Sequence, residues 1–170
     1  AGISFQWSKW WMKHSVYTHE LAERGQLLTH DKDLSVLTLM NLEDQIESDY
    51  EVLNPHWTLG QLIPIIERSS HNLFPVLDRH RRLLGLLDLQ DVREVMFDTK
   101  LYNTLKVHDL MVLPVATIQT HSKMEDVMKS FERSDAWFLP VLEGDEYRGF
   151  VSQTRLFDAY RKWLRESSIR

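Results

Sequence analysis

The sequence ERSSHNLFPVL at residues 67–77 returns 65 positions later as ERSDAWFLPVL at residues 132–142. Upstream of both copies, apolar residues stand at the i, i+3, i+4 and i+7 positions of a helix: Leu59, Leu62, Ile63 and Ile66, then Met124, Val127, Met128 and Phe131. A repeated unit of this kind buries its apolar face against a neighbouring copy. The repetition therefore predicts two related halves with a ligand-binding cleft between them.

The composition indicates a globular protein and excludes several functional classes. At 170 residues and 43% hydrophobic residues, the chain can form one ordinary domain or two small ones with a real core. Its net charge of −5 argues against a general nucleic-acid-binding protein. The absence of cysteine excludes disulfides, thiolate zinc ligands and thiol catalysis.

No apolar run approaches the roughly 18 residues that a membrane-spanning helix needs, and no signal peptide is visible at the N-terminus. The chain begins at Ala1 without methionine, which we interpret as a segment of a longer protein. Eight histidines are present, but none forms a His-Glu-x-x-His motif, and the sequence has no Asp-rich calcium loop and no Gly-x-Ser-x-Gly elbow. We therefore predict neither a metal site nor catalytic activity.

The first copy predicts the order β-α-β-β-α. The strands are expected at 51–53, 73–77 and 83–87, and the helices are expected to begin at Thr58 and near Asp88. Gln61 follows Thr58 by three residues, which is typical of a capping box. Pro64 falls inside this helix and should kink or shorten it.

The second copy predicts the same order, with strands at 117–118, 138–142 and 147–151 and a last helix whose apolar face carries Leu156, Tyr160, Trp163 and Leu164. Ser122 and Glu125 suggest another capping box at the start of its first helix. Two such copies predict an α+β fold, with small sheets covered by helices.

This order resembles a tandem pair of cystathionine-β-synthase (CBS) domains, also called a Bateman module. The resemblance is carried by FPV (74–76) and LPV (139–141) at the strands, and by GLLDLQD (85–91) and GFVSQTR (149–155) at the following helices. The family pattern at the last place is Gly, two apolar residues, Thr or Ser, two residues and Asp. The resemblance implies two β-α-β-β-α repeats related as a pseudo-two-fold pair, preceded by an N-terminal helix and connector.

The N-terminal stretches HSVYTHELAERG (14–25), HDKD (30–33) and VLTLM (36–40) resemble the connector that follows the last membrane helix of bacterial CLC-type voltage-gated chloride channels. This implies a cytosolic regulatory domain on the cytoplasmic side of the inner membrane. Its partners would be a second copy, bound through the CBS modules as a homodimer, and the membrane domain of the same polypeptide. The expected division is 1–40 for the helix and connector, 41–105 for CBS domain 1 and 106–170 for CBS domain 2.

Two alternatives stay open: a nucleotide-sensing CBS module of a soluble protein or enzyme, and a purely structural CBS scaffold. In all three cases the resemblance implies no required cofactor, with adenosine, AMP or ATP as a regulatory ligand. In the family the motif Asp binds the ribose hydroxyls, and the Thr or Ser binds ribose or phosphate at a helix start.

The chain departs from this motif in both copies. The first copy keeps Asp91 at the ribose position but has Asp88 where Thr or Ser is expected, and a carboxylate there repels phosphate. The second copy keeps Ser152 but has Arg155 in place of the ribose-binding Asp, and a guanidinium cannot accept a hydrogen bond.

We therefore expect the better pocket around Asp91, favouring adenosine or AMP over ATP, with walls from Thr117, Trp137 and Phe138. Asp91 could alternatively be an acid that only stabilises the first turn of its helix. The weaker pocket groups Ser152 and Arg155 with Val52, Leu73 and Phe74. There Arg155 would either bind phosphate or plug the site by pairing with an acid.

Two further features have several interpretations. The helical face with Trp7, Trp10 and Trp11 would lie at a membrane interface, pack on the CBS body or a second subunit, or belong to an ordinary amphipathic helix. The basic cluster at 79–82 would be a solvated turn, or would contact anionic lipid headgroups or another part of the channel.

Overall fold

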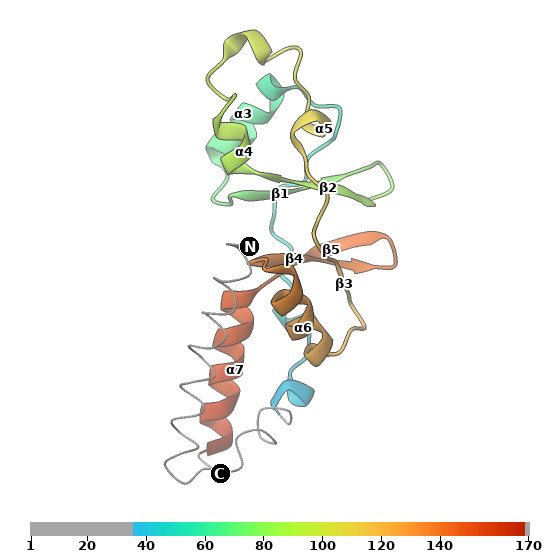
Figure 1. Ribbon diagram of the computed structural model, residues 1–170, viewed down its shortest axis with the longest axis vertical. Coiled ribbons are helices and arrows are strands. Elements are labelled where there is room, and N and C mark those ends of the chain that lie inside the picture. The colour runs from blue at the N-terminus through green and yellow to red at the C-terminus, as the bar shows by residue number, and fades with distance from the viewer. Residues whose placement is uncertain (1–35, 169–170) are drawn as a thin grey trace. The chain divides into compact units, whose positions relative to one another are not determined.

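The computed structural model describes residues 36–168 and shows a mixed α+β fold with two small sheets, which confirms the predicted fold class. Residues 36–39 form a helical turn. The elements that follow are η1 (Glu43–Gln45), α3 (Leu59–Arg68), β1 (Leu73–Leu77), β2 (Leu83–Asp88), α4 (Leu89–Arg93), η2 (Thr99–Leu101), α5 (Val107–Leu110), β3 (Ile118–Gln119), α6 (Met124–Ser134), β4 (Phe138–Glu143), β5 (Glu146–Ser152) and α7 (Gln153–Ser168) (Figure 1).

The chain divides into two compact units. Unit 1 contains, of the described residues, 36–46, 115–139 and 150–168, and unit 2 contains 47–114 and 140–149. Unit 2 thus combines most of the first repeat with two parts of the second, residues 106–114 and 140–149. Unit 1 combines the remaining parts of the second repeat with residues 36–46.

In unit 2, α3 begins as its sequence predicts. The Thr58 hydroxyl accepts from the Gln61 amide at 3.3 Å, and the Gln61 side chain accepts from the Thr58 amide at 2.9 Å. These reciprocal bonds satisfy two amides that a helix start leaves without a partner. Pro64 lies within α3, which nonetheless continues to Arg68.

The hairpin of unit 2 also forms as predicted. β1 pairs antiparallel with β2, so that Leu73 faces Asp88 and Val76 faces Gly85. The expected strand at 51–53 is reduced to a parallel bridge between Leu53 and Val76, with the Leu53 amide 2.9 Å from the Pro75 carbonyl. On the other edge Leu86 exchanges two hydrogen bonds of 2.8 Å with Val112.

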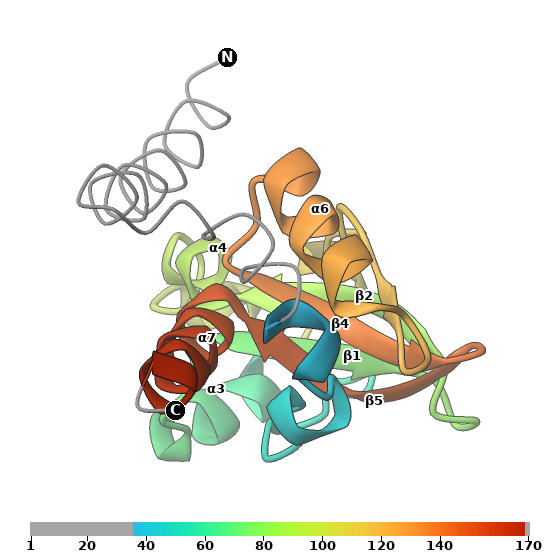
Figure 2. The ribbon, with the colours of Figure 1, turned by 90° about the horizontal axis from the view of Figure 1, so that it is seen from below.

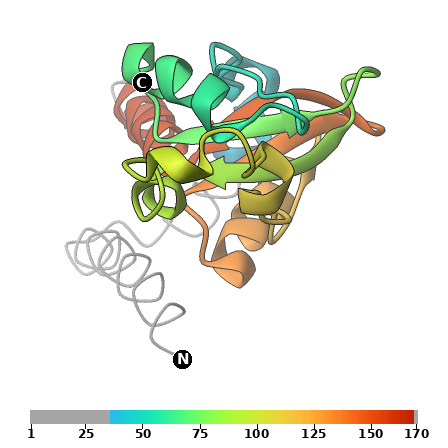
Figure 3. The same cartoon turned by 90° about the horizontal axis from the view of Figure 1, so that it is seen from above.

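The core of unit 2 lies between this hairpin and the helices that cover one of its faces, as Figures 1 and 3 show for α3, α4 and α5. It is made of aliphatic side chains and one aromatic ring: Leu53, Leu59, Leu62, Phe74, Val76, Leu87, Val92 and Val107. Strand β1 is buried along four of its five residues, which explains its unbroken apolar sequence.

The second sheet pairs β3 with β4 and β4 with β5, and unit 1 contributes β3, the start of β4 and the end of β5 to it. Figure 2 shows the two helices of unit 1, α6 and α7, from below. The buried face of α6 carries Met124, Val127 and Phe131, which is the helical spacing that the sequence predicts. The segment before the first repeat adds Val36, Met40 and Leu42 to the buried apolar residues of this unit.

The two remaining helix predictions concern the start of α6 and the N-terminal segment. The capping box of Ser122 and Glu125 is wrong, because α6 begins one residue later, at Met124, and the Ser122 hydroxyl instead accepts from the Gln119 amide at 3.2 Å. The predicted N-terminal helix over 1–24, with its tryptophan face, lies outside the described residues.

Candidate functional site

The start of α4, in unit 2, presents two carboxylates with different roles. Asp88 ends β2 and caps α4, because its side chain accepts from the Gln90 amide at 2.8 Å. Asp91 follows in the first turn of α4 and is exposed. Among the described residues, the Asp91 carboxylate makes no hydrogen bond or ion pair. It is therefore available to a ligand.

The start of α7, in unit 1, is the corresponding place in the second repeat, and its polar groups are engaged. Ser152 is only 6% exposed, and its hydroxyl accepts from the Arg155 amide at 3.2 Å. The Arg155 guanidinium donates to the main-chain carbonyl of Asp44 at 3.3 Å. Helix capping thus uses the hydroxyl that the resemblance assigns to a ligand, and Arg155 binds the chain itself.

The aromatic residues Trp137, just before β4, and Phe138, at its start, lie in unit 1 with Thr117. Trp137 is 52% and Phe138 38% exposed, and Thr117 is exposed just before β3. Since Asp91 belongs to unit 2, its grouping with these three residues stays a prediction.

The residues assigned to the weaker pocket from the first repeat are less accessible. Val52 and Leu73 are half-buried. Phe74 is 0% exposed and belongs to the core of unit 2. The grouping of Phe74 with Ser152 and Arg155 in the weaker pocket stays a prediction, and its ring is fully buried in unit 2.

Polar residues that the sequence did not single out surround the start of α7. Gln153 is 3% exposed, its amide donates to the Trp137 carbonyl at 3.0 Å, and its side-chain nitrogen donates to the Ala136 carbonyl. Its side-chain oxygen, with Ser134 Oγ and Asp135 Oδ2, is buried without a hydrogen-bond partner within residues 36–168. Asp135 ends α6 with φ of 62°, a left-handed conformation more usual for glycine.

A second polar cluster lies in unit 2, where the segment that opens the unit contacts the loop after α3. The Tyr50 and His71 rings stack with 4.1 Å between centroids, and Ser69 Oγ donates to Glu51 at 2.6 Å. Burial, with Glu47 nearby, raises the pKa of Tyr50 well above its usual range. This cluster orders the entry into the first repeat.

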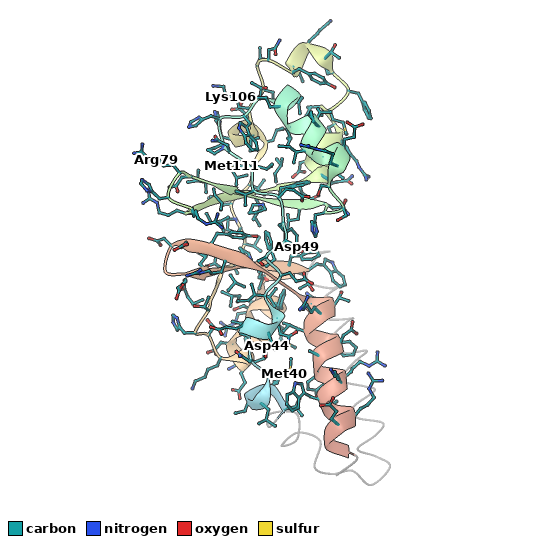
Figure 4. The ribbon with its side chains drawn as sticks, turned by 180° about the vertical axis from the view of Figure 1, so that it is seen from behind. Met40, Asp44, Asp49, Arg79, Lys106 and Met111 are labelled. Carbon is teal, nitrogen blue, oxygen red and sulfur yellow. The ribbon has the colours of Figure 1, made fainter. Side chains whose placement is uncertain are left out.

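The basic cluster 79–82 forms the turn between β1 and β2, where Arg79 projects (Figure 4). Asp78 holds this turn by accepting from the amides of His80 and Arg82 and from the Arg82 guanidinium. The hydrogen bond from the Arg82 amide is the main cause that lowers the pKa of Asp78. The turn is also joined to the second hairpin, since the Tyr147 amide donates to the Arg81 carbonyl at 3.0 Å.

Residues 36–168 contain no group of three or more His, Asp or Glu side chains suited to a metal ion. Within the same residues, no helix is long and apolar enough to cross a membrane. Within residues 36–168, the motif position of the first repeat presents the exposed carboxylate of Asp91, whereas the motif residues Ser152 and Arg155 of the second repeat bond to the chain itself.

Comparison with known proteins matches both repeats. A family model described as CBS domain matches residues 44–98 and 107–162, which is well over half of the chain. No match is found among curated proteins.

Several solved structures share the fold. A CBS domain protein from Streptococcus pneumoniae is 15% identical, with a TM-score of 0.68 over 82% of this chain and 99% of that one. CbpB in complex with c-di-AMP is 14% identical, with a TM-score of 0.67 over 81% and 95% of the two chains. The CBS domain of a bacterial CNNM/CorC family Mg²⁺ transporter in complex with ATP is 12% identical, with a TM-score of 0.66 over 76% and 93%.

Proposed function

Since the chain belongs to the CBS domain family and carries two such domains in tandem, as a Bateman module, we propose that it is a non-catalytic regulatory module that binds an adenine nucleotide. The observation that carries this proposal is the state of Asp91. Its carboxylate is exposed and uncommitted within residues 36–168, and a carboxylate can accept hydrogen bonds from both hydroxyls of a ribose.

The difference between the repeats supports one ligand per chain. In the second repeat, Ser152 caps its helix and Arg155 binds the Asp44 carbonyl. No ribose acceptor stands at that position, because Arg155 replaces it. We therefore assign the ligand to Asp91, with Thr117, Trp137 and Phe138 as the further contacts.

The charge around Asp91 favours a ligand with few phosphates. Asp88 and Asp91 place two carboxylates within four residues, and each repels a phosphate group brought near it. Adenosine and AMP should therefore bind more tightly than ATP. The c-di-AMP complex of CbpB and the ATP complex of the Mg²⁺ transporter domain support an adenine-containing ligand for this fold.

For the parent protein we propose the cytosolic C-terminal domain of a bacterial CLC-type voltage-gated chloride channel or transporter, acting as a homodimer at the cytoplasmic side of the inner membrane. The resemblance of residues 14–40 supports this, and Val36 and Met40 of that stretch are buried in unit 1. The proposed division at 1–40, 41–105 and 106–170 belongs to this account. Binding would shift the packing of the paired modules and so bias the membrane domain.

The second candidate is a nucleotide sensor in a soluble protein, which the match to two CBS domains fits equally well. Sequencing the gene upstream of the Ala1 codon distinguishes the two: a series of apolar, membrane-spanning segments supports the channel, and a soluble domain supports the sensor. Light scattering tests the dimer, and a strict monomer at high protein concentration would contradict it.

Calorimetric titration of the protein with adenosine, AMP, ADP and ATP tests the binding itself. The proposal expects saturable heat, strongest with adenosine or AMP. The absence of heat with all four would overturn nucleotide sensing and leave a structural scaffold.

A further inference from the structure

The first turn of α7 joins two segments of unit 1 that lie far apart in the sequence. On one side, Gln153 holds the loop before β4, through its amide to the Trp137 carbonyl and through its side chain to the Ala136 carbonyl. On the other side, Arg155 holds the Asp44 carbonyl at 3.3 Å. Only Thr154 separates these two anchoring residues.

The loop that Gln153 holds carries the exposed ring of Trp137. Two donors from one buried residue bind consecutive carbonyls, so the loop and the helix start cannot move independently without breaking both bonds. Buried hydrogen bonds are costly to leave unmade. A ligand that stacks on Trp137 would therefore also fix the start of α7.

The segment that Arg155 holds is the entry to the first repeat. It is anchored by the buried side chains of Met40 and Leu42, and its turn is closed by the Gln45 amide on the Leu42 carbonyl at 2.9 Å. Figure 4 shows Met40 and Asp44 on this segment alongside α7. Residue 47, immediately after it, is the first of unit 2.

We propose that Gln153 and Arg155 form a relay in which the first turn of α7 transmits the state of the Trp137 loop to the segment at 36–46. The part of this inference in which a ligand on Trp137 sets the state of the loop rests on the proposed nucleotide function. The relay explains why the second repeat has arginine at the ribose position: Arg155 acts there as a positioning residue toward the entry segment.

A coupling of this kind needs an element whose state both ends influence. In the relay this element is the first turn of α7, and its output is the turn at 42–46, which Arg155 contacts at Asp44. Gln45 and Ile46 close that turn by donating to Leu42 and Glu43, and amide exchange reports its opening. Hydrogen exchange at these two amides is therefore the readout. The amides of Val127 and Phe131, in α6 of the same unit, serve as an internal control for unfolding of unit 1 as a whole.

The first arm needs no ligand and compares Gln153→Met, Arg155→Met and Arg155→Lys with the parent chain. The relay predicts that both Met variants raise exchange at Gln45 and Ile46 at least threefold with Val127 and Phe131 unchanged. Arg155→Lys should restore part of the protection, because lysine still donates to a carbonyl. Unchanged exchange at Gln45 and Ile46 in Gln153→Met overturns the relay.

The second arm adds AMP at a concentration that saturates each variant by calorimetry. In the parent chain, AMP should slow exchange both at residues 136–138 and at Gln45 and Ile46. In Arg155→Met, only the first effect should persist. If AMP gives binding heat but no change in exchange at Gln45 and Ile46 of the parent chain, the relay is contradicted and the proposed function stands. If AMP gives no heat, nucleotide binding is contradicted, and the ligand-free comparison of the variants alone decides on the relay.

Discussion

The carboxylate of Asp88 accepts a hydrogen bond from the Gln90 amide, with 2.8 Å between Oδ1 and N. Aspartate, serine and threonine all serve well as helix caps, so Asp88 performs structurally the task that Ser152 performs in the second repeat by accepting from Arg155. The departure from the family pattern at Asp88 therefore preserves the helix start while adding a negative charge beside Asp91.

Asp88→Asn should strengthen ATP binding, because asparagine caps a helix as well as aspartate does but no longer repels phosphate. Removing one charge should change the affinity for ATP by roughly three- to tenfold and the affinity for adenosine very little. Calorimetry with both ligands measures the two effects. Equal changes for ATP and adenosine would show that the charge of Asp88 does not reach the phosphates.

Thr58→Ala should destabilise the protein by about 1 kcal/mol, since it removes one half of the capping box of α3. Ser122→Ala is the matched comparison, because Ser122 stands before α6 without capping it. Urea unfolding should show the smaller loss for Ser122→Ala. A larger loss there than for Thr58→Ala would mean that Ser122 caps α6 in solution.

Phe74→Ala should cost about 3–5 kcal/mol, the usual range for a phenylalanine removed from a core, because its ring is fully buried in unit 2. Trp137→Ala should cost about 1 kcal/mol or less, since half of that side chain is exposed. If nucleotide binding depends on Trp137 as proposed, its variant loses affinity while retaining stability. Circular dichroism melting and calorimetry on the same samples separate these effects.

The alkaline stability of the protein should depend on Tyr147. Burial, more than the neighbouring Tyr50, raises the pKa of Tyr147 above its usual range. A raised pKa in the folded state means that its contribution is fully present below about pH 10, the pKa of the unfolded chain, and is lost as the pH rises through the folded value. Tyr147→Phe should therefore flatten the fall in unfolding free energy above about pH 10. An unchanged slope would show that Tyr147 does not titrate with unfolding.

Much of the fold follows from local sequence signals. The hairpin β1–β2 follows from two apolar runs around a polar turn, and α3 follows from Thr58 and Gln61, because both signals act through neighbours in the chain. Ser122 carries the same signal as Thr58 but is used otherwise. Its hydroxyl has a competing partner three residues back, the Gln119 amide, and the sequence cannot rank the two bonds.

The site depends more on contacts between distant segments. Leu73 and Phe74 are adjacent apolar residues of one strand, and the sequence does not reveal that only Phe74 loses all exposure. The sequence gives Gln153 no special role in its helix, because its hydrogen bond to the Ala136 carbonyl forms only in the folded chain. The bond from Arg155 to Asp44 spans 111 residues, so no local pattern could have predicted it.

The most direct test of the central claim is the number of AMP molecules that each chain binds, measured by calorimetry for the parent protein and for Asp91→Asn, which keeps the size of the side chain. The account predicts one AMP per chain for the parent protein and an affinity at least tenfold weaker for Asp91→Asn, with the melting temperature unchanged. Undiminished binding by Asp91→Asn, or two AMP molecules per parent chain, would contradict the assignment of the ligand to the first repeat.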